Sequence, residues 1–110
     1  MHTRFELKKT PDEHYLFDLL NDDQLIARSG HYKSRASALS GIASARKNAQ
    51  RQGAFVTKVG DRGRLYFTIR ASNGQEICQS PLYTTNARCK KVIEAVKQMA
   101  PQAPIDDHSS

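Results

Sequence analysis

Apolar and polar residues alternate along several short stretches of the chain, and this period of two predicts β-strands. In residues 3–8, Phe5 and Leu7 share one face while the residues between them are polar. Residues 15–19 and 24–29 continue the pattern, with a tight turn predicted at residues 21–23. The second half predicts three more strands at 54–59, 65–71 and 75–80, and Asn73-Gly74 between the last two is a strong hairpin signal.

A helical period follows each group of three strands. Ser34 and Thr85 are the predicted N-caps of two helices. Each helix has one apolar stripe, which we expect to face the sheet: Ala38, Ile42, Ala45 and Ala49 in the first, and Cys89, Ile93, Val96 and Ala100 in the second. The small residues of the first stripe would let that helix lie close to the strands, whereas Val92 and Met99 widen the second. Pro101 ends the second helix, and residues 101–110 are predicted to be a disordered tail.

The two halves of the chain are copies of one pattern. Phe5 aligns with Phe55 and Phe17 with Phe67, and a one-residue deletion near Asn21 restores the register for the rest: Gln24/Gln75, Ile26/Ile77, Ser29/Ser80, Tyr32/Tyr83 and Ile42/Ile93. Two units are too few for a solenoid, which usually needs at least three. We therefore predict that the copies complete one core, as a single domain over residues 1–100 with repeats at about 3–50 and 53–100.

The most specific run is Asn-Gly-Gln-x-Ile-x-x-Ser-x-x-Tyr at residues 73–83. Together with Gly41-Ile42-Ala43-Ser44 in the first copy, it resembles the YegP-like family of small bacterial proteins of unknown function. The resemblance spans nearly all of residues 3–100. It implies an α+β fold in which two tandem β-β-β-α repeats and a further strand form one shared, mainly antiparallel sheet, with exchanged terminal strands and two helices packed on one face.

The resemblance implies no activity, and the chain departs from the family pattern in two places. Asp22-Asp23 stands where the pattern has Asn-Gly, and Val92-Ile93-Glu94-Ala95 replaces the Gly-Ile-Ala-Ser of the first helix. We therefore expect the second helix to pack differently from the first.

Composition agrees with one small domain of a cytoplasmic protein. The 110 residues are 38% apolar, without a run long enough to span a membrane and without a secretory signal at the start. Cys78 and Cys89 replace Ala27 and Ala38 of the first copy, so we interpret both as free thiols. Cys89 lies on the apolar helical stripe, and Cys78, which has the opposite strand parity from Ile77, is expected to be partly exposed.

Candidate chemistry is weak. Ser29 and His31 suggest a nucleophile with its base, but the second copy has Leu82 in place of the histidine and no acidic group is evident. Ser29 and Ser80 are better explained as partners for backbone groups left unpaired where a strand ends. The histidines lack ligand spacing, so we predict no enzyme, no catalytic residue, no cofactor and no metal site. A small-molecule pocket between the two copies would need no motif and stays an open alternative.

Charge is the feature that suggests a partner, because the net charge is +6. We predict that the helices present an outward basic surface that contacts nucleic acid or another polyanion: Arg46, Lys47, Arg88, Lys90, Lys91 and Lys97. The opposite face of the sheet carries by parity a second candidate, a weak stacking platform of Lys58, Tyr66 and Arg70 with Arg4, Lys8 and Leu16. The plain alternative is a charged surface that aids solubility and protects strand edges.

A protein-interaction module is the alternative to a nucleic-acid module. In that interpretation the uncovered sheet face or the edge strands meet another protein or a second copy of the chain, through Leu16, Leu20, Leu25 and Tyr66. A membrane partner is not expected.

Overall fold

The structure is a computed structural model that describes residues 2–109. Its elements alternate along the chain as the sequence predicts, with three strands and a helix in each half. The first half holds β1 (Thr3–Lys9), β2 (Tyr15–Asn21), β3 (Gln24–Ser29) and α1 (Arg35–Asn48). The second holds β4 (Phe55–Val59), the 3-10 turn η1 (Asp61–Gly63), β5 (Leu65–Arg70), β6 (Glu76–Gln79) and α2 (Asn86–Met99), followed by η2 (Ala100–Gln102) and β7 (Ile105–His108).

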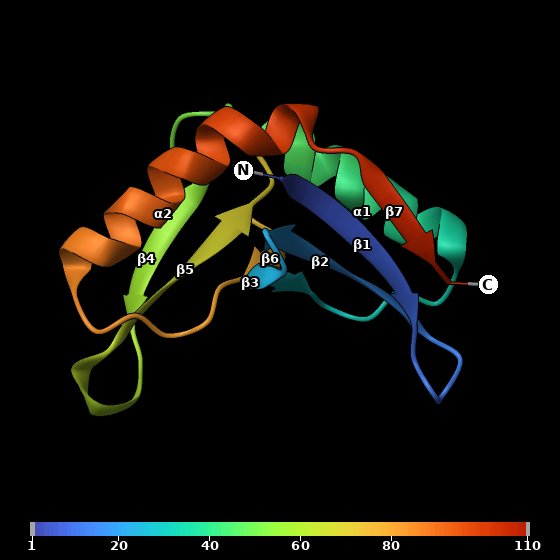
Figure 1. Cartoon of the computed structure of the whole chain (residues 1–110), viewed down its shortest axis with the longest axis horizontal. Helices are drawn as coiled ribbons and strands as arrows, with labels where there is room; N and C mark the ends of the chain where they lie inside the picture. The colour runs from blue at the N-terminus through green and yellow to red at the C-terminus, as the bar shows by residue number, and fades with distance from the viewer. Residues whose placement is uncertain (1, 110) are drawn as a thin grey trace.

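Within the described residues, seven strands form one sheet in the order β4-β5-β6-β3-β2-β1-β7. Every pairing is antiparallel except that of β1 with β7. The repeats meet at a short ladder between β3 and β6, where Arg28 pairs with Gln79 and Ser29 with Cys78. The sheet bends into an inverted V with both helices on its upper side and the lower face uncovered (Figure 1). The predicted α+β fold with one shared sheet is therefore confirmed.

The strand β7 contradicts the predicted disordered tail at residues 101–110. After η2, the carbonyl of Pro104 accepts a hydrogen bond of 2.8 Å from the amide of Phe5, and residues 105–108 then pair in parallel with β1. The outer edge of β1 would otherwise leave backbone groups unpaired. Pairing through the backbone needs no apolar alternation, so the polar sequence of this segment carried no strand signal. The strand after each helix thus lies in the half of the sheet built by the other repeat.

The core lies between the sheet and the two helices. Phe5, Phe17 and Phe67 are fully buried there, and every residue of both predicted helical stripes is buried. Ser34 and Thr85 cap the helices as predicted, their hydroxyls accepting hydrogen bonds from the amides of residues 37 and 88.

The two helices pack differently because of one glycine. A Cβ on Gly41 would lie 2.3 Å from the hydroxyl oxygen of Tyr32, whose ring stacks on Phe17 at 6.2 Å. In the second copy Val92 occupies this position. Helix α1 contacts strands β1, β2, β5 and β6, whereas the main strand contact of α2 is with β5. The expected difference between the helices is therefore present.

The repeated serines do what the sequence analysis expected of them. Ser29 accepts a hydrogen bond of 2.9 Å from the amide of Phe17, and Ser80 accepts one of 2.9 Å from the amide of Phe67. Each hydroxyl also donates to the carbonyl of the residue that follows it, at 2.8 Å. Both hydroxyls are thus engaged where a strand ends.

Cys78 is buried, against the expectation of partial exposure. The register of β5 with β6 shifts between Ile69 and Arg70, and this irregularity places both Ile77 and Cys78 in the core. Burial raises the pKa of the Cys78 thiol to about 12. Cys89 is also a buried free thiol.

Candidate functional site

The basic residues of α2 form an exposed surface. Arg88, Lys90 and Lys91 are all exposed, and no ion pair within residues 2–109 involves them. We call these three residues the α2 basic surface. Lys97 differs from them, because its ammonium nitrogen lies 3.3 Å from the carboxylate of Glu94 and 5.7 Å from the ring centroid of Phe55.

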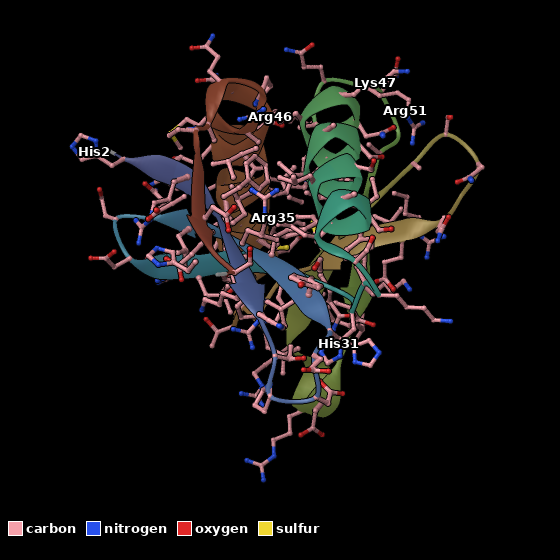
Figure 2. All side chains as sticks on the ribbon, turned by 90° about the vertical axis from the view of Figure 1, so that its right-hand side faces the viewer. His2, His31, Arg35, Arg46, Lys47 and Arg51 are labelled. Atoms are coloured by element: carbon pink, nitrogen blue, oxygen red, sulfur yellow. The ribbon has the colours of Figure 1, made fainter. Side chains whose placement is uncertain are left out.

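Arg46 does not belong to an outward surface, contrary to the prediction. Its guanidinium carbon lies 5.7 Å from the ring centroid of Phe5, and it donates a hydrogen bond to the carbonyl of Ala103. Figure 2 shows Arg46 between the two helices, with Lys47 on the far side of α1. The predicted basic surface over both helices is therefore split, with Lys47 separate from the α2 basic surface.

Two of the three predicted open-sheet residues, Lys58 and Tyr66, lie side by side on adjacent strands, whereas Arg70 lies four residues further along β5. Lys58 of β4 pairs directly with Tyr66 of β5, and Arg70 ends β5. All three side chains are partly buried. A single aromatic ring is a poor stacking surface, since single-strand modules use two or three.

The uncovered face of the first repeat is neutralised by its own ion pairs. Asp18 is only 1% exposed, and its two carboxylate oxygens accept hydrogen bonds of 2.7 and 3.0 Å from Arg28. The ammonium of Lys8 lies 3.0 Å from the same carboxylate and 3.2 Å from that of Glu6. Burial acts to raise the pKa of Asp18, but the hydrogen bonds from Arg28 and Lys8 outweigh it, and this pKa lies below its ordinary value. Among residues 2–109, this half of the face has no group of free cations.

The same face offers little apolar surface for a partner. Leu16 and Leu20 were expected to be available there, but each is only 8% exposed. Long charged side chains on the neighbouring strand cover them, because Lys8 pairs with Leu16 and Arg4 with Leu20.

Glu6, Asp106 and His108 form the one side-chain group in the described part of the chain with metal-ligand spacing, their ligand atoms lying within 4.8 Å of one another. Positively charged side chains already lie beside its carboxylates. Arg4 lies 3.8 Å from Asp106 and 3.5 Å from Glu6, and the ammonium of Lys8 lies 3.2 Å from Glu6. Two nearby positive charges disfavour a metal ion, so we interpret the group as part of the ion-pair network on β1 and β7.

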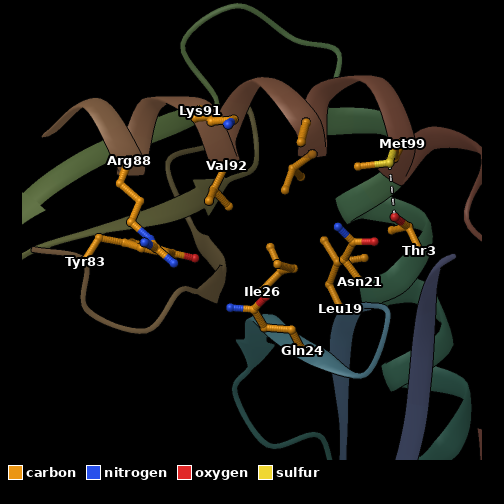
Figure 3. A pocket seen from close by; sticks show the side chains of 12 residues that line it. Thr3, Leu19, Asn21, Gln24, Ile26, Tyr83, Arg88, Lys91, Val92 and Met99 are labelled. Atoms are coloured by element: carbon orange, nitrogen blue, oxygen red, sulfur yellow. Dashed lines mark hydrogen bonds between the residues drawn. The ribbon is translucent and has the colours of Figure 1, made fainter. Parts of the chain in front are cut away.

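A cavity of about 350 Å³ lies between α2 and the β2–β3 hairpin (Figure 3). We call it the α2 cleft. The two repeats build it together, because one wall comes from β1, β2 and β3 and the other from α2 and from Tyr83 in the segment that precedes it. Its apolar lining is Leu19, Ile26, Val92, Ala95, Val96 and Met99, and its polar lining is Thr3, Asn21, Gln24, Tyr83, Arg88 and Lys91.

The polar lining of the α2 cleft is positively charged. Arg88 extends toward Tyr83 at one end, while Asn21 and Gln24 lie on the opposite wall (Figure 3). The oxygen Oδ1 of the Asn21 side chain is buried and has no hydrogen-bond partner within residues 2–109. The described residues that line the cleft include two cations and no carboxylate.

The duplication places a second cleft between α1 and the β5–β6 hairpin, with a volume of about 200 Å³. We call it the α1 cleft. At the positions of Arg88, Lys91 and Val92 it has Ser37, Ser40 and Gly41, and it is also lined by Glu76. The two related clefts therefore differ in charge and in size. Sequence reasoning left a pocket between the copies open but did not locate it; the signal was the loss of the Gly-Ile-Ala-Ser run in the second helix.

The family is visible in both copies. The family model described as "Domain of unknown function (DUF1508)" matches residues 11–54 and again residues 61–107. The chain belongs to this family. The first match begins before β2 and ends just before β4, and the second begins before β5 and ends within β7. Each match therefore runs from the second strand of a repeat to the strand that follows its helix, which agrees with the exchanged strands of the fold.

Relatives that span the whole chain are also proteins of unknown function. The chain is 40% identical over 110 residues to the UPF0339 protein PA0329 of Pseudomonas aeruginosa, covering 99% of this chain and 100% of that one. It is 33% identical over 106 residues to the UPF0339 protein YegP of Escherichia coli O157:H7, covering 96% of each chain. The resemblance to the YegP-like family is thereby confirmed.

Two solved structures share the fold. The solution NMR structure of the UPF0339 protein SO3888 from Shewanella oneidensis has a TM-score of 0.91 at 25% identity, covering 99% of this chain and 93% of that one. The solution NMR structure of the protein of unknown function YegP from E. coli has a TM-score of 0.89 at 32% identity, covering 100% and 96%. Within residues 2–109, none of the helices combines the length and the apolar character needed to cross a membrane.

Proposed function

We propose that the protein is a non-catalytic binding module that contacts nucleic acid through the α2 basic surface. The observation that carries the proposal is that Arg88, Lys90 and Lys91 are exposed and have no acidic partner in the described part of the chain. Arginine and lysine side chains that are not neutralised locally supply the sequence-independent part of nucleic-acid affinity, because they release counterions from the phosphate backbone.

The α2 basic surface supports backbone contacts and not base reading. Tyr83, the aromatic residue next to it, is 8% exposed and stacks on Phe67 at 6.4 Å, so its ring has little free face for a base. Phosphate contacts position a protein on nucleic acid but carry no sequence information. We therefore expect binding with little sequence preference and with strong dependence on salt.

Fluorescence polarisation tests this proposal with labelled single-stranded RNA, single-stranded DNA and duplex DNA at low and near-physiological salt. Reversal of Lys90 and Lys91 to glutamate should weaken binding by roughly tenfold or more and flatten the salt dependence. The matched control reverses Lys33 and Lys47, two exposed lysines outside α2, and so changes the net charge by the same amount. Equal loss in both variants, or no loss in the first, would overturn the assignment to α2.

Self-association through the edge strand β4 is a second candidate function. Strand β4 pairs with β5 on one side and is the outer strand at that end of the sheet. Its last residue, Val59, is 71% exposed. An unprotected strand edge pairs readily with another chain. Sedimentation velocity over a range of concentrations should show a dimer that Val59→Lys weakens; a monomer at every concentration would refute this candidate.

A further inference from the structure

We propose that the α2 cleft binds a small amphiphilic anion, an aliphatic carboxylate whose chain enters the cleft and whose head group meets Arg88 and Lys91. This inference concerns a ligand and goes beyond contact with nucleic acid. The volume of about 350 Å³ falls within the range of small-molecule sites. Such sites combine mostly apolar walls with a few convergent polar groups, and the α2 cleft has both.

The apolar walls are provided by both repeats. Leu19 and Ile26 come from the β2–β3 hairpin, while Val92 and Met99 come from α2. Val92 and Met99 are only partly buried, so part of this apolar surface still faces water. An aliphatic chain that covers these side chains removes apolar surface from water, which is favourable and needs no directional contact. Methionine adapts to chains of different shape.

The polar groups select the charge of the head group. Arg88 and Lys91 supply two cations, and no residue of the described lining supplies a carboxylate to neutralise them. The guanidinium of an arginine matches a carboxylate with two parallel hydrogen bonds. Figure 3 shows the amide nitrogen of Asn21 on the cavity side, where it can donate to an anion.

The cleft extends past Arg88. A neighbouring cavity of about 280 Å³ shares Gln24, Tyr83 and Arg88 with it and continues toward Leu25 and Leu82. Leu82 is 39% exposed. Arg88 therefore stands between two hollows with apolar residues in each. This arrangement suits an elongated ligand better than a compact, wholly polar one.

The α1 cleft serves as an internal control, because the duplicated backbone is similar there but the lining side chains differ. Its lining contains three serines, Gly41, Gln75 and Glu76 beside Tyr32, Ala71 and Ile77. It lacks the two cations of the α2 cleft and has no counterpart of the large apolar side chains of Leu19, Val92 and Met99. An anionic head group would meet a carboxylate there, and the aliphatic chain would meet hydroxyl groups. We therefore expect the ligand in the α2 cleft alone.

The test is a two-dimensional 15N NMR titration of the full chain with decanoate, kept below its micelle concentration. Decyltrimethylammonium, which has the same chain and the opposite charge, is the matched ligand control. We expect saturable shifts of the amide signals of Ile26, Val92 and Met99 with decanoate, without comparable shifts at Ser40 and Ile77. The cation should produce much smaller shifts.

Three variants locate the site. Ala95→Phe fills the cleft from α2 and should abolish the shifts. Lys91→Glu should weaken decanoate binding by roughly three- to tenfold. Lys90→Glu is its control, because it makes the same charge change at a residue that does not line the cleft, and its affinity for decanoate should stay within about twofold of that of the natural protein. Circular dichroism should show that each variant stays folded.

Binding of decanoate and decyltrimethylammonium with equal strength, equal shifts at both clefts, or full binding by folded Ala95→Phe would overturn the proposal. Failure of this proposal can be distinguished from failure of the nucleic-acid proposal. Nucleic-acid binding is measured without decanoate and should depend on both Lys90 and Lys91, whereas decanoate binding should depend on Lys91 and not on Lys90.

Discussion

At equivalent buried positions on the uncovered sheet face, the first repeat has a charged pair of residues and the second has a neutral pair. Replacing the charged pair with the neutral one tests how much the ion pairs stabilise the protein. In the first repeat, Asp18 is 1% exposed and is paired with Arg28 and Lys8. The equivalent positions of Asp18 and Arg28 in the second repeat hold the neutral residues Thr68 and Gln79, which face each other on β5 and β6. Thr68 is fully buried.

Replacing Arg28 with glutamine leaves a buried carboxylate with Lys8 as its remaining cation. Removing one partner of a buried ion pair typically costs about 3–5 kcal/mol. The Arg28 side chain is 51% exposed and Lys8 stays in place, so we expect a smaller loss, about 2 kcal/mol of unfolding free energy. Asp18→Thr alone should cost about 1 kcal/mol, because Arg28 can then extend into water.

The double variant Asp18→Thr, Arg28→Gln reproduces the pair of the second repeat, and its unfolding free energy should be about 1 kcal/mol below that of the natural protein. The resulting coupling energy is about 2 kcal/mol, within the range for residues in direct contact. Urea denaturation followed by far-ultraviolet circular dichroism measures all four proteins; the chain has no tryptophan for fluorescence. Additive single effects, or an Arg28→Gln loss below about 0.5 kcal/mol, would refute the reasoning.

The pH dependence of the same four proteins gives an independent readout. The pKa of Asp18 in the folded protein lies below the ordinary value of 3.8. A carboxyl with a depressed folded pKa stabilises the protein above its unfolded pKa, and this contribution is lost as the pH falls through the folded pKa. The stability difference between the natural protein and Asp18→Thr should therefore narrow below pH 3.8.

Three further predictions concern the core. Gly41→Val should lower the unfolding free energy by about 1–3 kcal/mol, because the new Cβ would lie 2.3 Å from the Tyr32 hydroxyl oxygen; an unchanged Tm would contradict this. In a Cys89→Ser background, native Cys78 should resist a disulfide reagent at pH 8 and react once urea unfolds the chain, since burial raises its pKa to about 12; rapid native reaction would show an accessible thiol. Ser80→Ala should cost about 1–3 kcal/mol in urea denaturation by leaving a buried β5 amide unpaired, and a loss under 0.5 kcal/mol would mean that another group replaces the hydroxyl.

The regular elements were predictable because their signals are local. The alternation around Phe5 and Phe17, the helical stripes and the caps Ser34 and Thr85 all depend on residues close together in the sequence. Strand β7 was not predictable in this way. Its side chains are all exposed, and its place is decided by the free edge of β1, far away in the chain.

The candidate site was predictable only in part. The exposed cations of α2 follow from helical periodicity, since they lie off the apolar stripe. Arg46 lies off the corresponding stripe of α1, yet it turns inward because the η2–β7 segment offers it the carbonyl of Ala103 and the ring of Phe5 lies beneath it. A long side chain can follow whatever neighbours the fold provides, so its direction is not encoded by its own position alone.

The sequence by itself determined the duplication, the order of strands and helices, the core face of each element and the excess of positive charge. These properties depend on local periodicity, on self-similarity and on composition. The tertiary structure decided which strands meet at the centre, the addition of β7, the neutralisation of the uncovered face and the opening of the α2 cleft. Each of these depends on distances between residues that are remote in the sequence. In the cleft the decisive cause is steric, because Val92 of α2 stands where Gly41 of α1 lets that helix lie against Tyr32.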